Sequence, residues 1–293
     1  YIRRITELES LIKQFACVAI LGPRQCGKST LVKHFISKKK NIVYLDLEKR
    51  SDRNKIEHDP ELFLQRNKES VICFDEIQYV PELFSALRSE IDERGKKGQF
   101  IVLGSASPEL LKQSSQSLTG RIAYLELTPF TLEEVGQKHQ FEHWLKGGFP
   151  DSFLTKTHHD SMVWRENYIK TFLERDISQL GFNVASRQIE RLWMMLAHVN
   201  GQCLNSSKLG GSLGVTHKTI RSYIDILEQT YMIRVLYPFE KNIKKRLVKS
   251  PKIYFRDTGL MHSLLDIETD NDLLGHPGYG SSWEGYVIEQ VIN

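Results

Sequence analysis

An eight-residue motif near the amino terminus limits the folds open to this chain more than any other feature. Residues 22–29 read Gly-Pro-Arg-Gln-Cys-Gly-Lys-Ser and match G-x-x-x-x-G-K-[ST] at every position. An apolar run, Ala16–Leu21, precedes the motif, and an amphipathic stretch, Ser29–Ile36, follows it. A glycine-rich loop between a strand and a helix directs backbone N–H groups at phosphate oxygens. The motif therefore predicts a nucleotide-binding α/β domain.

Short apolar runs recur through the first half of the chain, with amphipathic stretches between them. This alternation is typical of a parallel sheet whose strands are joined by crossover helices. The runs hold few polar residues, as expected for strands that helices cover on both faces. We predict an α/β fold of the P-loop NTPase type, a parallel sheet with flanking helices. Its strands are Ala16–Leu21, Asn41–Leu45, Val71–Phe74, Phe100–Leu103 and Ile122–Leu127, and its helices include Ser29–Ile36, Pro60–Asn67 and Pro81–Glu93.

The glycine-rich loop itself supplies most of the predicted nucleotide contacts. Lys28 is placed to reach the β- and γ-phosphates, and the hydroxyl of Ser29 is placed to bind Mg²⁺. The backbone of the loop and the first turn of the helix would provide the rest. The full predicted set is Gly22, Pro23, Arg24, Gln25, Cys26, Gly27, Lys28, Ser29 and Thr30.

Two carboxylates follow the strand at residues 71–74. Asp75 and Glu76 lie where that strand ends, and ligands of open α/β sheets bind at the carboxyl ends of the strands. Asp75 is predicted to hold Mg²⁺ through water, and Glu76 to act as the base or to orient the attacking water. An acid pair after a strand is weak evidence alone, but downstream of the glycine-rich loop it predicts a Walker B motif.

Signatures of other nucleotide-binding classes are missing from the sequence. Guanine-specific proteins usually carry N-K-x-D, which Asn67-Lys68-Glu69-Ser70 does not match. The ABC transporter signature is absent as well, because Leu209-Gly210-Gly211-Ser212 has the wrong order. The predicted ligands are therefore ATP and Mg²⁺, and the predicted activity is ATP hydrolysis.

Two further residues each have a functional and an ordinary structural interpretation. Ser105 follows the strand predicted at 100–103, so it could contact the γ-phosphate or the water, or satisfy its own turn. Arg121 precedes the strand predicted at 122–127. It could neutralise transition-state charge, from the same or a neighbouring subunit, or it could be a solvated surface residue. Both assignments stay open at this point.

The four cysteines form no pair at metal-binding spacing. Most lie in or beside apolar runs, so buried thiols and a reducing compartment, the cytoplasm, are expected. Cys26 has two interpretations: a helix amino terminus lowers a thiol pKa and would make it reactive, or it is an inert filler. No run approaches the roughly 18 apolar residues that span a bilayer, so no membrane association is expected.

The character of the sequence changes near Pro129. We predict an ATPase core at 1–130, a helical lid or connector at 131–185 and a winged helix-turn-helix at 186–240. Residues 241–293 would begin a C-terminal domain that continues beyond Asn293. The predicted helices are Leu132–Leu145, Ser161–Leu180, Arg187–Val199 and Trp283–Ile292, and a strand is predicted at Lys252–Phe255.

Residues 203–227 have the spacing of a helix-turn-helix. A first helix ends near Leu213, Gly214 supplies the turn, and Thr216 caps a second helix with an apolar face. The polar face of that helix could contact double-stranded DNA, and it shows His217, Lys218, Arg221 and Ser222. A basic run follows, formed by Lys241, Lys244, Lys245, Arg246, Lys249 and Lys252. Because the net charge is only +4, DNA binding would depend on such local clusters.

Taken together, these motifs resemble those of a prokaryotic AAA-family ATPase of the group that carries a C-terminal domain of unknown function. The resemblance covers nearly the whole chain. In the first half it rests on residues 22–29, Phe74-Asp75-Glu76-Ile77-Gln78, Leu103-Gly104-Ser105-Ala106-Ser107 and Thr119-Gly120-Arg121. Farther along it rests on Gly147-Gly148-Phe149-Pro150, Glu174-Arg175-Asp176-Ile177, Pro251-Lys252-Ile253-Tyr254-Phe255-Arg256-Asp257-Thr258-Gly259-Leu260 and Trp283-Glu284-Gly285-Tyr286-Val287.

The resemblance implies an ATPase core, a helical lid, a winged helix and then a restriction-endonuclease-like domain. The carboxylate and lysine motif of that last domain would lie after Asn293, so neither Asp257 nor Glu284 is assigned as a nuclease residue. The loop departs from the usual family pattern at Cys26, where a small aliphatic residue is common, and this change is not expected to harm binding.

We therefore predict that Mg-dependent ATP binding and hydrolysis drive a conformational switch of the winged helix, which contacts DNA or a protein partner. DNA contact is assigned to Lys218 and Arg221, and a homo-oligomer is implied if Arg121 acts across subunits. The alternative is a nucleotide-dependent recruitment module with little turnover, although a pure binder has no need of a base at Glu76. A third interpretation, a small-molecule kinase, requires an acceptor pocket that the sequence does not reveal.

Overall fold

The computed structural model describes residues 1–37, 41–105, 116–182, 184–239 and 249–293. The chain divides into two compact units, of which the first holds residues 3–128 and the second residues 129–293. Within the described ranges, no helix has the length and apolar character needed to cross a membrane.

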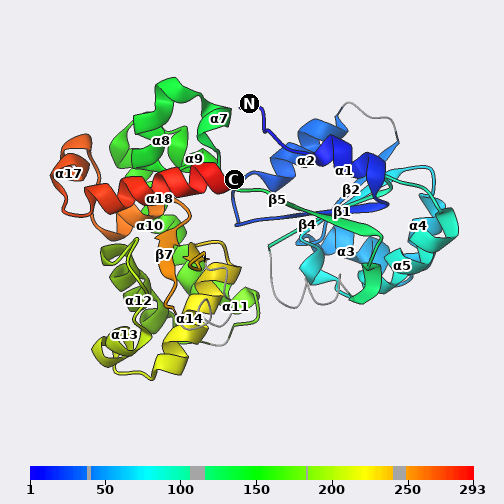
Figure 1. The fold of residues 1–293 in the computed structure, drawn as a ribbon. Coiled ribbons are helices and arrows are strands. Elements are labelled where there is room, and N and C mark those ends of the chain that lie inside the picture. The colour runs from blue at the N-terminus through cyan, green and yellow to red at the C-terminus, as the bar shows by residue number, and fades with distance from the viewer. Residues whose placement is uncertain (38–40, 106–115, 183, 240–248) are drawn as a thin grey trace. The chain divides into compact units, whose positions relative to one another are not determined.

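A parallel sheet forms the centre of the first unit (Figure 1), and the described residues contribute five strands to it. Its order is β2-β3-β4-β1-β5, and every neighbouring pair is parallel. The predicted α/β class is confirmed, and each predicted strand is present with its ends moved by no more than one residue. The strands are β1 (Cys17–Leu21), β2 (Ile42–Asp46), β3 (Val71–Asp75), β4 (Phe100–Gly104) and β5 (Ile122–Glu126).

Helices cover both faces of this sheet (Figure 1). On one face, α1 (Leu8–Gln14) and α2 (Lys28–Ile36) bury Ile12 and Val32 against Ile20 and other apolar residues of the strands. The other face is covered by α3 (Arg50–Glu57), α4 (Pro60–Arg66) and α5 (Leu83–Arg94). β1 is buried along its whole length, as its uniformly apolar sequence requires.

The carboxyl ends of β1, β3 and β4 meet at one edge of the sheet. Leu21 pairs with Gly104 in the β1–β4 register, and Phe74 pairs with Val102 in the β3–β4 register. The residues that follow these strands are therefore neighbours in space, although they come from three distant parts of the chain. This edge holds the glycine-rich loop, the acid pair and Ser105.

The second unit is mainly helical, with one antiparallel pair of strands among its described residues. Its larger elements are α8 (Gln140–Lys146), α10 (His158–Thr171), α12 (Ser186–His198), α13 (Ser206–Leu213), α14 (His217–Gln229), β6 (Ile233–Leu236), β7 (Lys252–Phe255), α16 (Thr258–Leu264) and α18 (Tyr279–Ile292). Shorter elements are α7 (Leu132–Val135), α9 (Pro150–Phe153), α11 (Ile177–Gln179) and α17 (Asp270–Gly275).

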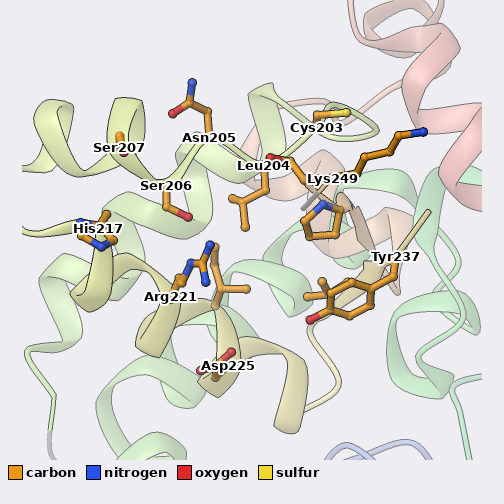
Figure 2. Close-up of a pocket in the computed structure, with 14 residues that line it drawn as sticks. Cys203, Leu204, Asn205, Ser206, Ser207, His217, Arg221, Asp225, Tyr237 and Lys249 are labelled. Atoms are coloured by element: carbon orange, nitrogen blue, oxygen red, sulfur yellow. The ribbon is translucent and has the colours of Figure 1, made fainter. Parts of the chain in front are cut away.

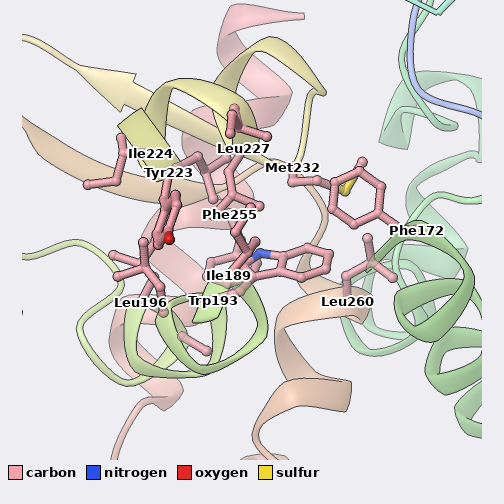
Figure 3. Close-up of a cluster of buried hydrophobic side chains, with 14 of the residues drawn as sticks. Phe172, Ile189, Trp193, Leu196, Tyr223, Ile224, Leu227, Met232, Phe255 and Leu260 are labelled. Atoms are coloured by element: carbon pink, nitrogen blue, oxygen red, sulfur yellow. The ribbon is translucent and has the colours of Figure 1, made fainter. Parts of the chain in front are cut away.

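One hydrophobic cluster joins elements between Phe149 and Met261 (Figure 3). Trp193 of α12 stacks on Phe255 of β7 with ring centroids 6.1 Å apart, and Phe172 lies 5.3 Å from Trp193. Leu227 of α14 and Leu260 of α16 belong to the same cluster. The predicted borders at 185 and 240 therefore fall inside one core, and β6 pairs with β7 across the second of them. The three predicted segments thus share one compact unit, and their borders stay predictions.

Two predicted helices differ in detail from the structure. The stretch Leu132–Leu145 is divided, because Gly136 has a φ of 88° and ends α7. The stretch Ser161–Leu180 is continuous but not uniform, since a π-helical segment at Phe172–Asp176 connects α10 to α11.

Candidate nucleotide-binding site

The glycine-rich loop leaves β1 at Gly22 and enters α2 at Lys28. Gly27 is the N-cap of α2, and its φ of 99° strongly favours glycine. At Gly22 a Cβ atom would lie 2.1 Å from the carbonyl oxygen of Leu127, so a side chain has no room there. The unpaired N–H groups of the first turn of α2 make this loop suited to bind phosphate.

Lys28 is buried at the start of α2, with 5% of its surface exposed. Its ammonium group donates hydrogen bonds to the carbonyl oxygens of Gly22, at 2.9 Å, and Pro23, at 2.7 Å. The side chain thus closes the loop on itself. A bound phosphate would offer this ammonium group charged acceptors in place of neutral ones, and charge-assisted hydrogen bonds are the stronger kind.

Asp75 is the last residue of β3 and is 5% exposed. Its Oδ2 atom accepts a hydrogen bond from the hydroxyl of Tyr44, in the neighbouring strand β2. Its Oδ1 atom is buried and has no hydrogen-bond partner among the described residues. A buried acceptor left without a partner is unfavourable by about 1–3 kcal/mol, more for a charged group, so this atom is suited to receive a ligand.

Glu76 follows Asp75 with a φ of 56°, a left-handed conformation that is uncommon for a residue other than glycine. Its carboxylate accepts a hydrogen bond from the side-chain amide of Gln78. Burial raises the pKa of Glu76, while the charge of Lys28 and the bond from Gln78 oppose the rise. A carboxylate with a raised pKa is a better proton acceptor near neutral pH.

Ser105 follows β4 at the same sheet edge and is 4% exposed. Its hydroxyl oxygen is buried without a hydrogen-bond partner in the described part of the chain. Contacts with its own turn, the structural alternative, are therefore not seen within that part. Ala106 and Ser107 of the same motif lie outside the described residues.

The oxygen atoms at this edge fit a magnesium ion that arrives with a nucleotide. A serine hydroxyl and a single carboxylate, from Ser29 and Asp75, are the donors that Mg²⁺ uses together with phosphate oxygens. Among the described residues, no group of three or more His, Cys, Asp or Glu side chains forms a metal site of its own. We therefore expect any ion here to depend on the phosphates for its remaining ligands.

Exposure differs among the other predicted loop residues. Pro23 is buried, Arg24 and Ser29 are half-buried, and Gln25 and Thr30 are exposed. Thr30 thus lies on the outer side of the first turn of α2, whereas the side chain of Ser29 lies near Tyr44.

Cys26 does not have the environment of a reactive thiol. Its side chain is fully buried, and its Sγ atom lies 3.3 Å from the carbonyl oxygen of Leu127, to which it donates. Burial raises the pKa of Cys26 and outweighs the charges of Lys28 and Arg4, which lower it. The interpretation as a reactive thiol is corrected accordingly, because desolvation dominates over the helix amino terminus.

Arg121 is not brought to the glycine-rich loop of its own chain. The backbone N–H of Cys17, the first residue of β1, donates to the carbonyl oxygen of Arg121 at 3.2 Å. Arg121 therefore lies at the amino-terminal edge of the sheet, opposite the edge that holds the loop. Its guanidinium group pairs with Asp92 of α5 at 2.5 and 2.9 Å. A role within its own subunit is not supported, and a role across subunits remains a prediction.

Two residues near the glycine-rich loop were not predicted from the sequence to have a role in the site. Tyr44 belongs to no motif, and Arg4 lies in the segment before α1. The guanidinium group of Arg4 donates to the carbonyl oxygens of Cys26, at 2.8 Å, and Thr128, at 2.6 Å. Both residues act through contacts with distant parts of the chain, which spacing along the sequence does not predict.

A second candidate site is a groove in the second unit, between α13, α14 and residues 249–251 (Figure 2). Its volume is about 1040 Å³. Arg221 extends into it from α14, with Ser206 on one side and Asp225 on the other. The polar and aromatic lining residues include Ser206, Ser207, His217, Arg221, Tyr237 and Lys249.

The other basic residues predicted for this region are placed differently. Lys218 is exposed but does not line the groove. Lys252 donates to Glu284 at 3.1 Å and to Tyr254 at 3.2 Å, so it is engaged within the unit. Lys241, Lys244, Lys245 and Arg246 lie outside the described residues.

Asp257 and Glu284 both have structural partners. Asp257 caps α16 by accepting from the backbone N–H of Leu260 at 2.9 Å, and it also accepts from that of Gly148 at 2.8 Å. Glu284 accepts from the hydroxyl of Tyr254 at 2.6 Å. These contacts account for both carboxylates without a metal ion.

A parallel sheet of this strand order, with a glycine-rich loop after β1 and an acid pair after β3, defines a nucleotide-binding domain of the P-loop type. Comparison with protein families shows which domains the two halves of the chain resemble. Residues 14–136 match a family described as an AAA domain, and residues 137–271 match one described as a domain of unknown function (DUF8612). The first unit is therefore similar in sequence to AAA domains.

Two bacterial relatives match most of the chain. They are uncharacterized proteins of Mycobacterium tuberculosis and Mycobacterium bovis, each 42% identical over 274 residues. The match covers 94% of this chain and 62% of each relative, so the chain spans somewhat less than two thirds of their length.

Two solved structures show distant similarity. The DNA clamp loader delta protein of Bacillus subtilis is 12% identical, with 98% of each chain covered and a TM-score of 0.37. A chain of the Drosophila ORC bound to DNA is 10% identical, with 90% of this chain and 94% of that chain covered and a TM-score of 0.35. TM-scores this low establish neither a shared fold nor a shared function.

Proposed function

We propose that the first unit binds Mg-ATP and hydrolyses it. One observation carries this proposal: the loop at 22–29, the acid pair and Ser105 converge on one sheet edge. There, Asp75 Oδ1 and Ser105 Oγ are buried without partners in the described part of the chain. Two unsatisfied oxygens beside a loop that favours phosphate are expected where a ligand completes the site.

The residues of the loop would bind and orient the triphosphate. Backbone N–H groups at the start of α2 hold phosphate oxygens, and Lys28 moves its hydrogen bonds from Gly22 and Pro23 to the β- and γ-phosphates. Ser29 and Asp75 hold the magnesium ion, which when bound neutralises the charge that develops on the phosphates.

Glu76 would act on the attacking water. Its carboxylate accepts the proton of that water or orients it, and the bond from Gln78 fixes the carboxylate in place. Ser105 would donate to the γ-phosphate or to the water. Both groups lie at the ends of adjacent strands, so they approach the ligand from the sheet edge.

Steady-state ATP hydrolysis with Mg²⁺, for the parent chain and for Glu76→Gln, tests this proposal. We expect hydrolysis to fall at least about 100-fold in the variant, the scale of a lost general base, while ATP binding persists. Lys28→Ala should lose binding as well. Glu93→Gln, an exposed position on α5, is the matched control and should behave as the parent chain. Hydrolysis that survives both active-site changes would refute the assignment.

A nucleotide-dependent recruitment module with little turnover is the alternative. It shares the binding site and differs only in the role of Glu76. Tight ATP binding by the parent chain, with no hydrolysis under any condition, would favour it.

We further propose that the second unit contacts DNA through the groove beside α14. The elements α12, α13, α14, β6 and β7 follow one another in the order of a winged helix, and α14 would be its recognition helix. Arg221 and Lys249 provide positive charge at the groove, and Asp225 is the one acid among its described lining residues. Cationic side chains of this kind bind the phosphate backbone with little sequence preference.

Fluorescence anisotropy with a labelled DNA duplex tests this contact. Arg221→Ala should weaken binding and reduce the slope of log affinity against log salt by about 1, as the loss of one phosphate contact predicts. Lys218→Ala tests whether the open face of α14 also contributes. Lys170→Ala, exposed on α10, is the control. No binding by the parent chain would move the proposal to a protein partner.

Hydrolysis would change the conformation of the second unit through the chain segment that joins the two. The carbonyl oxygen of Leu127 touches the loop at Gly22 and Cys26, and the second unit begins two residues later at Pro129. Movement of the loop on nucleotide binding would therefore reach the junction directly. A homo-oligomer, in which Arg121 reaches a neighbouring site, belongs to the same proposal.

A further inference from the structure

Tyr44 occupies a position next to both proposed magnesium ligands, and no motif assigns it a role. It lies in β2, where it pairs with Cys73 of β3. Side chains alternate between the two faces of a strand, so Tyr44, Cys73 and Asp75 point to the same face of the sheet. That face is the one covered by α2, because Cys73 and Tyr44 pack in the cluster that contains Leu31 and Val32.

The tyrosine side chain lies beneath α2 in a fixed orientation. The ammonium group of Lys33 lies over its ring, 5.1 Å from the centroid. Ser29 stands one helical turn before Lys33, and its side chain lies near the Tyr44 hydroxyl. Residues four apart on a helix face the same way, so α2 contacts both the ring and the hydroxyl of Tyr44.

The hydroxyl of Tyr44 also donates to Asp75 Oδ2. It therefore stands between a serine from α2 and an aspartate from β3, two residues that are 46 positions apart in the sequence, from 29 to 75. The second carboxylate oxygen, Oδ1, has no partner among the described residues. With Oδ2 fixed by the tyrosine, the carboxylate has one oxygen left for the ligand.

We propose that Tyr44 is a positioning residue for the magnesium site, which holds Ser29 and Asp75 in the arrangement that the metal–nucleotide complex requires. This role rests on the proposed function. Mg²⁺ demands near-ideal octahedral geometry, so a site whose ligands are already oriented binds it with a smaller loss of side-chain freedom.

The variant Tyr44→Phe tests the role because it keeps the ring and removes only the hydroxyl. The packing under Lys33 and within the α2 cluster is preserved. Asp75 Oδ2 then has no fixed donor, and Ser29 loses a polar neighbour. Tyr124→Phe, on β5 at the opposite edge of the sheet, is the matched control.

Two measurements separate metal positioning from a general structural effect. The first is binding of a non-hydrolysable fluorescent ATP analogue at Mg²⁺ concentrations from zero, with EDTA, to 10 mM, roughly saturating for such sites. The second is binding of Mn²⁺ in place of Mg²⁺ in the presence of the analogue, followed by the loss of the free-ion electron paramagnetic resonance signal. Neither measurement depends on turnover.

We expect Tyr44→Phe to bind the analogue in EDTA as the parent chain does, within about twofold. The Mg²⁺ concentration at half-maximal enhancement should rise about tenfold, which corresponds to about 1.4 kcal/mol, and Mn²⁺ should bind more weakly by a similar factor. Tyr124→Phe should match the parent chain in both measurements.

Three results would overturn the proposal. An unchanged metal dependence means that the hydroxyl has no part in the site, and tighter metal binding means that the tyrosine competes with the ion. An equal loss of analogue binding with and without metal means that Tyr44 only supports the fold. If the parent chain binds no nucleotide at all, the proposed function is refuted, and so is the role of Tyr44 that rests on it.

Discussion

At the scale of single residues, Glu76 combines two features that a protein tolerates only with compensation. Its side chain is half-buried, and its backbone has a left-handed φ of 56°. Such strain is typical of functional positions, where geometry matters more than stability. The raised pKa of Glu76 shows that the folded protein disfavours the charged form.

This environment predicts a gain in stability when the charge is removed. A carboxyl group whose pKa is raised in the folded state destabilises the fold progressively as the pH rises above its ordinary value, near 4.5. We therefore expect nucleotide-free Glu76→Gln to unfold about 2–4 °C above the parent chain at pH 7.5, and the difference to shrink toward pH 4. Circular dichroism in a pH series measures it. No difference, or a difference that grows as the pH falls, would contradict the assigned environment.

The positions of single residues could be predicted from the sequence where a motif defines their spacing. Lys28 and Asp75 lie at positions that a loop motif and a strand end define, and the structure brings them to one sheet edge. Tyr44 and Arg4 were missed because their roles arise from hydrogen bonds to residues far along the chain, Asp75, Cys26 and Thr128. A single sequence contains no record of such pairings.

At the scale of elements, Asp257 connects two segments, and each of them carries one of the motifs on which the family resemblance rests. Its two carboxylate oxygens accept from Leu260, at the start of α16, and from Gly148, in the turn before α9. A Cβ atom at Gly147 would lie 2.2 Å from this carboxylate, so the turn packs directly against it. The glycine pair and the aspartate are thus parts of one structural contact.

Asp257→Ala should therefore weaken the second unit without any effect of metal. We expect a loss of about 2–3 kcal/mol, from a helix cap and a charged hydrogen bond, and a smaller loss in Asp257→Asn. Denaturant unfolding followed by tryptophan fluorescence reports on this unit, because all four tryptophans lie beyond residue 128. Glu166→Ala, exposed on α10, is the control. Unchanged stability would mean that the carboxylate has another role.

Element-scale prediction was accurate for the sheet and weaker elsewhere. The strands of the first unit are buried on both faces, and continuous apolar runs mark them clearly. β6 was missed because its four residues, Ile233–Leu236, include Arg234 and follow α14 closely. The end of α7 at Gly136 was missed because a glycine within a helical pattern does not by itself indicate a positive φ.

At the scale of the whole molecule, Arg4 ties the beginning of the first unit to its end. Its two hydrogen bonds join the glycine-rich loop, through Cys26, to Thr128, the last residue of that unit. The side chain is 8% exposed, so the contact is shielded from water. Charge-assisted hydrogen bonds of this kind contribute about 1.5–3 kcal/mol each.

Arg4→Ala should lower the stability of the first unit and leave the second unchanged. Circular dichroism is expected to show an earlier transition, while the tryptophan transition stays at the denaturant concentration of the parent chain. Arg4→Lys should restore part of the loss, because it keeps the charge but not the two-pronged geometry. A shift of the tryptophan transition in Arg4→Ala would show that the two units do not unfold independently.

The predicted borders within the second half rest on local patterns and stay predictions. Helices and a basic run suggested three segments, yet Phe172, Trp193 and Phe255 pack in one cluster. Contacts between residues 60 or more positions apart decide where a domain ends, and local patterns do not contain them.

This shared cluster also decides how the protein can be cut into working pieces. A fragment that ends at residue 240 would lack β7 and α16, and would leave one face of Trp193 and the length of β6 exposed to water. Such a piece would tend to aggregate, since an unpaired strand edge and an uncovered apolar surface both recruit other chains. The smallest portable part of the second half therefore extends at least from Phe149 to Met261. A fragment that keeps the groove beside α14 must therefore include that larger range.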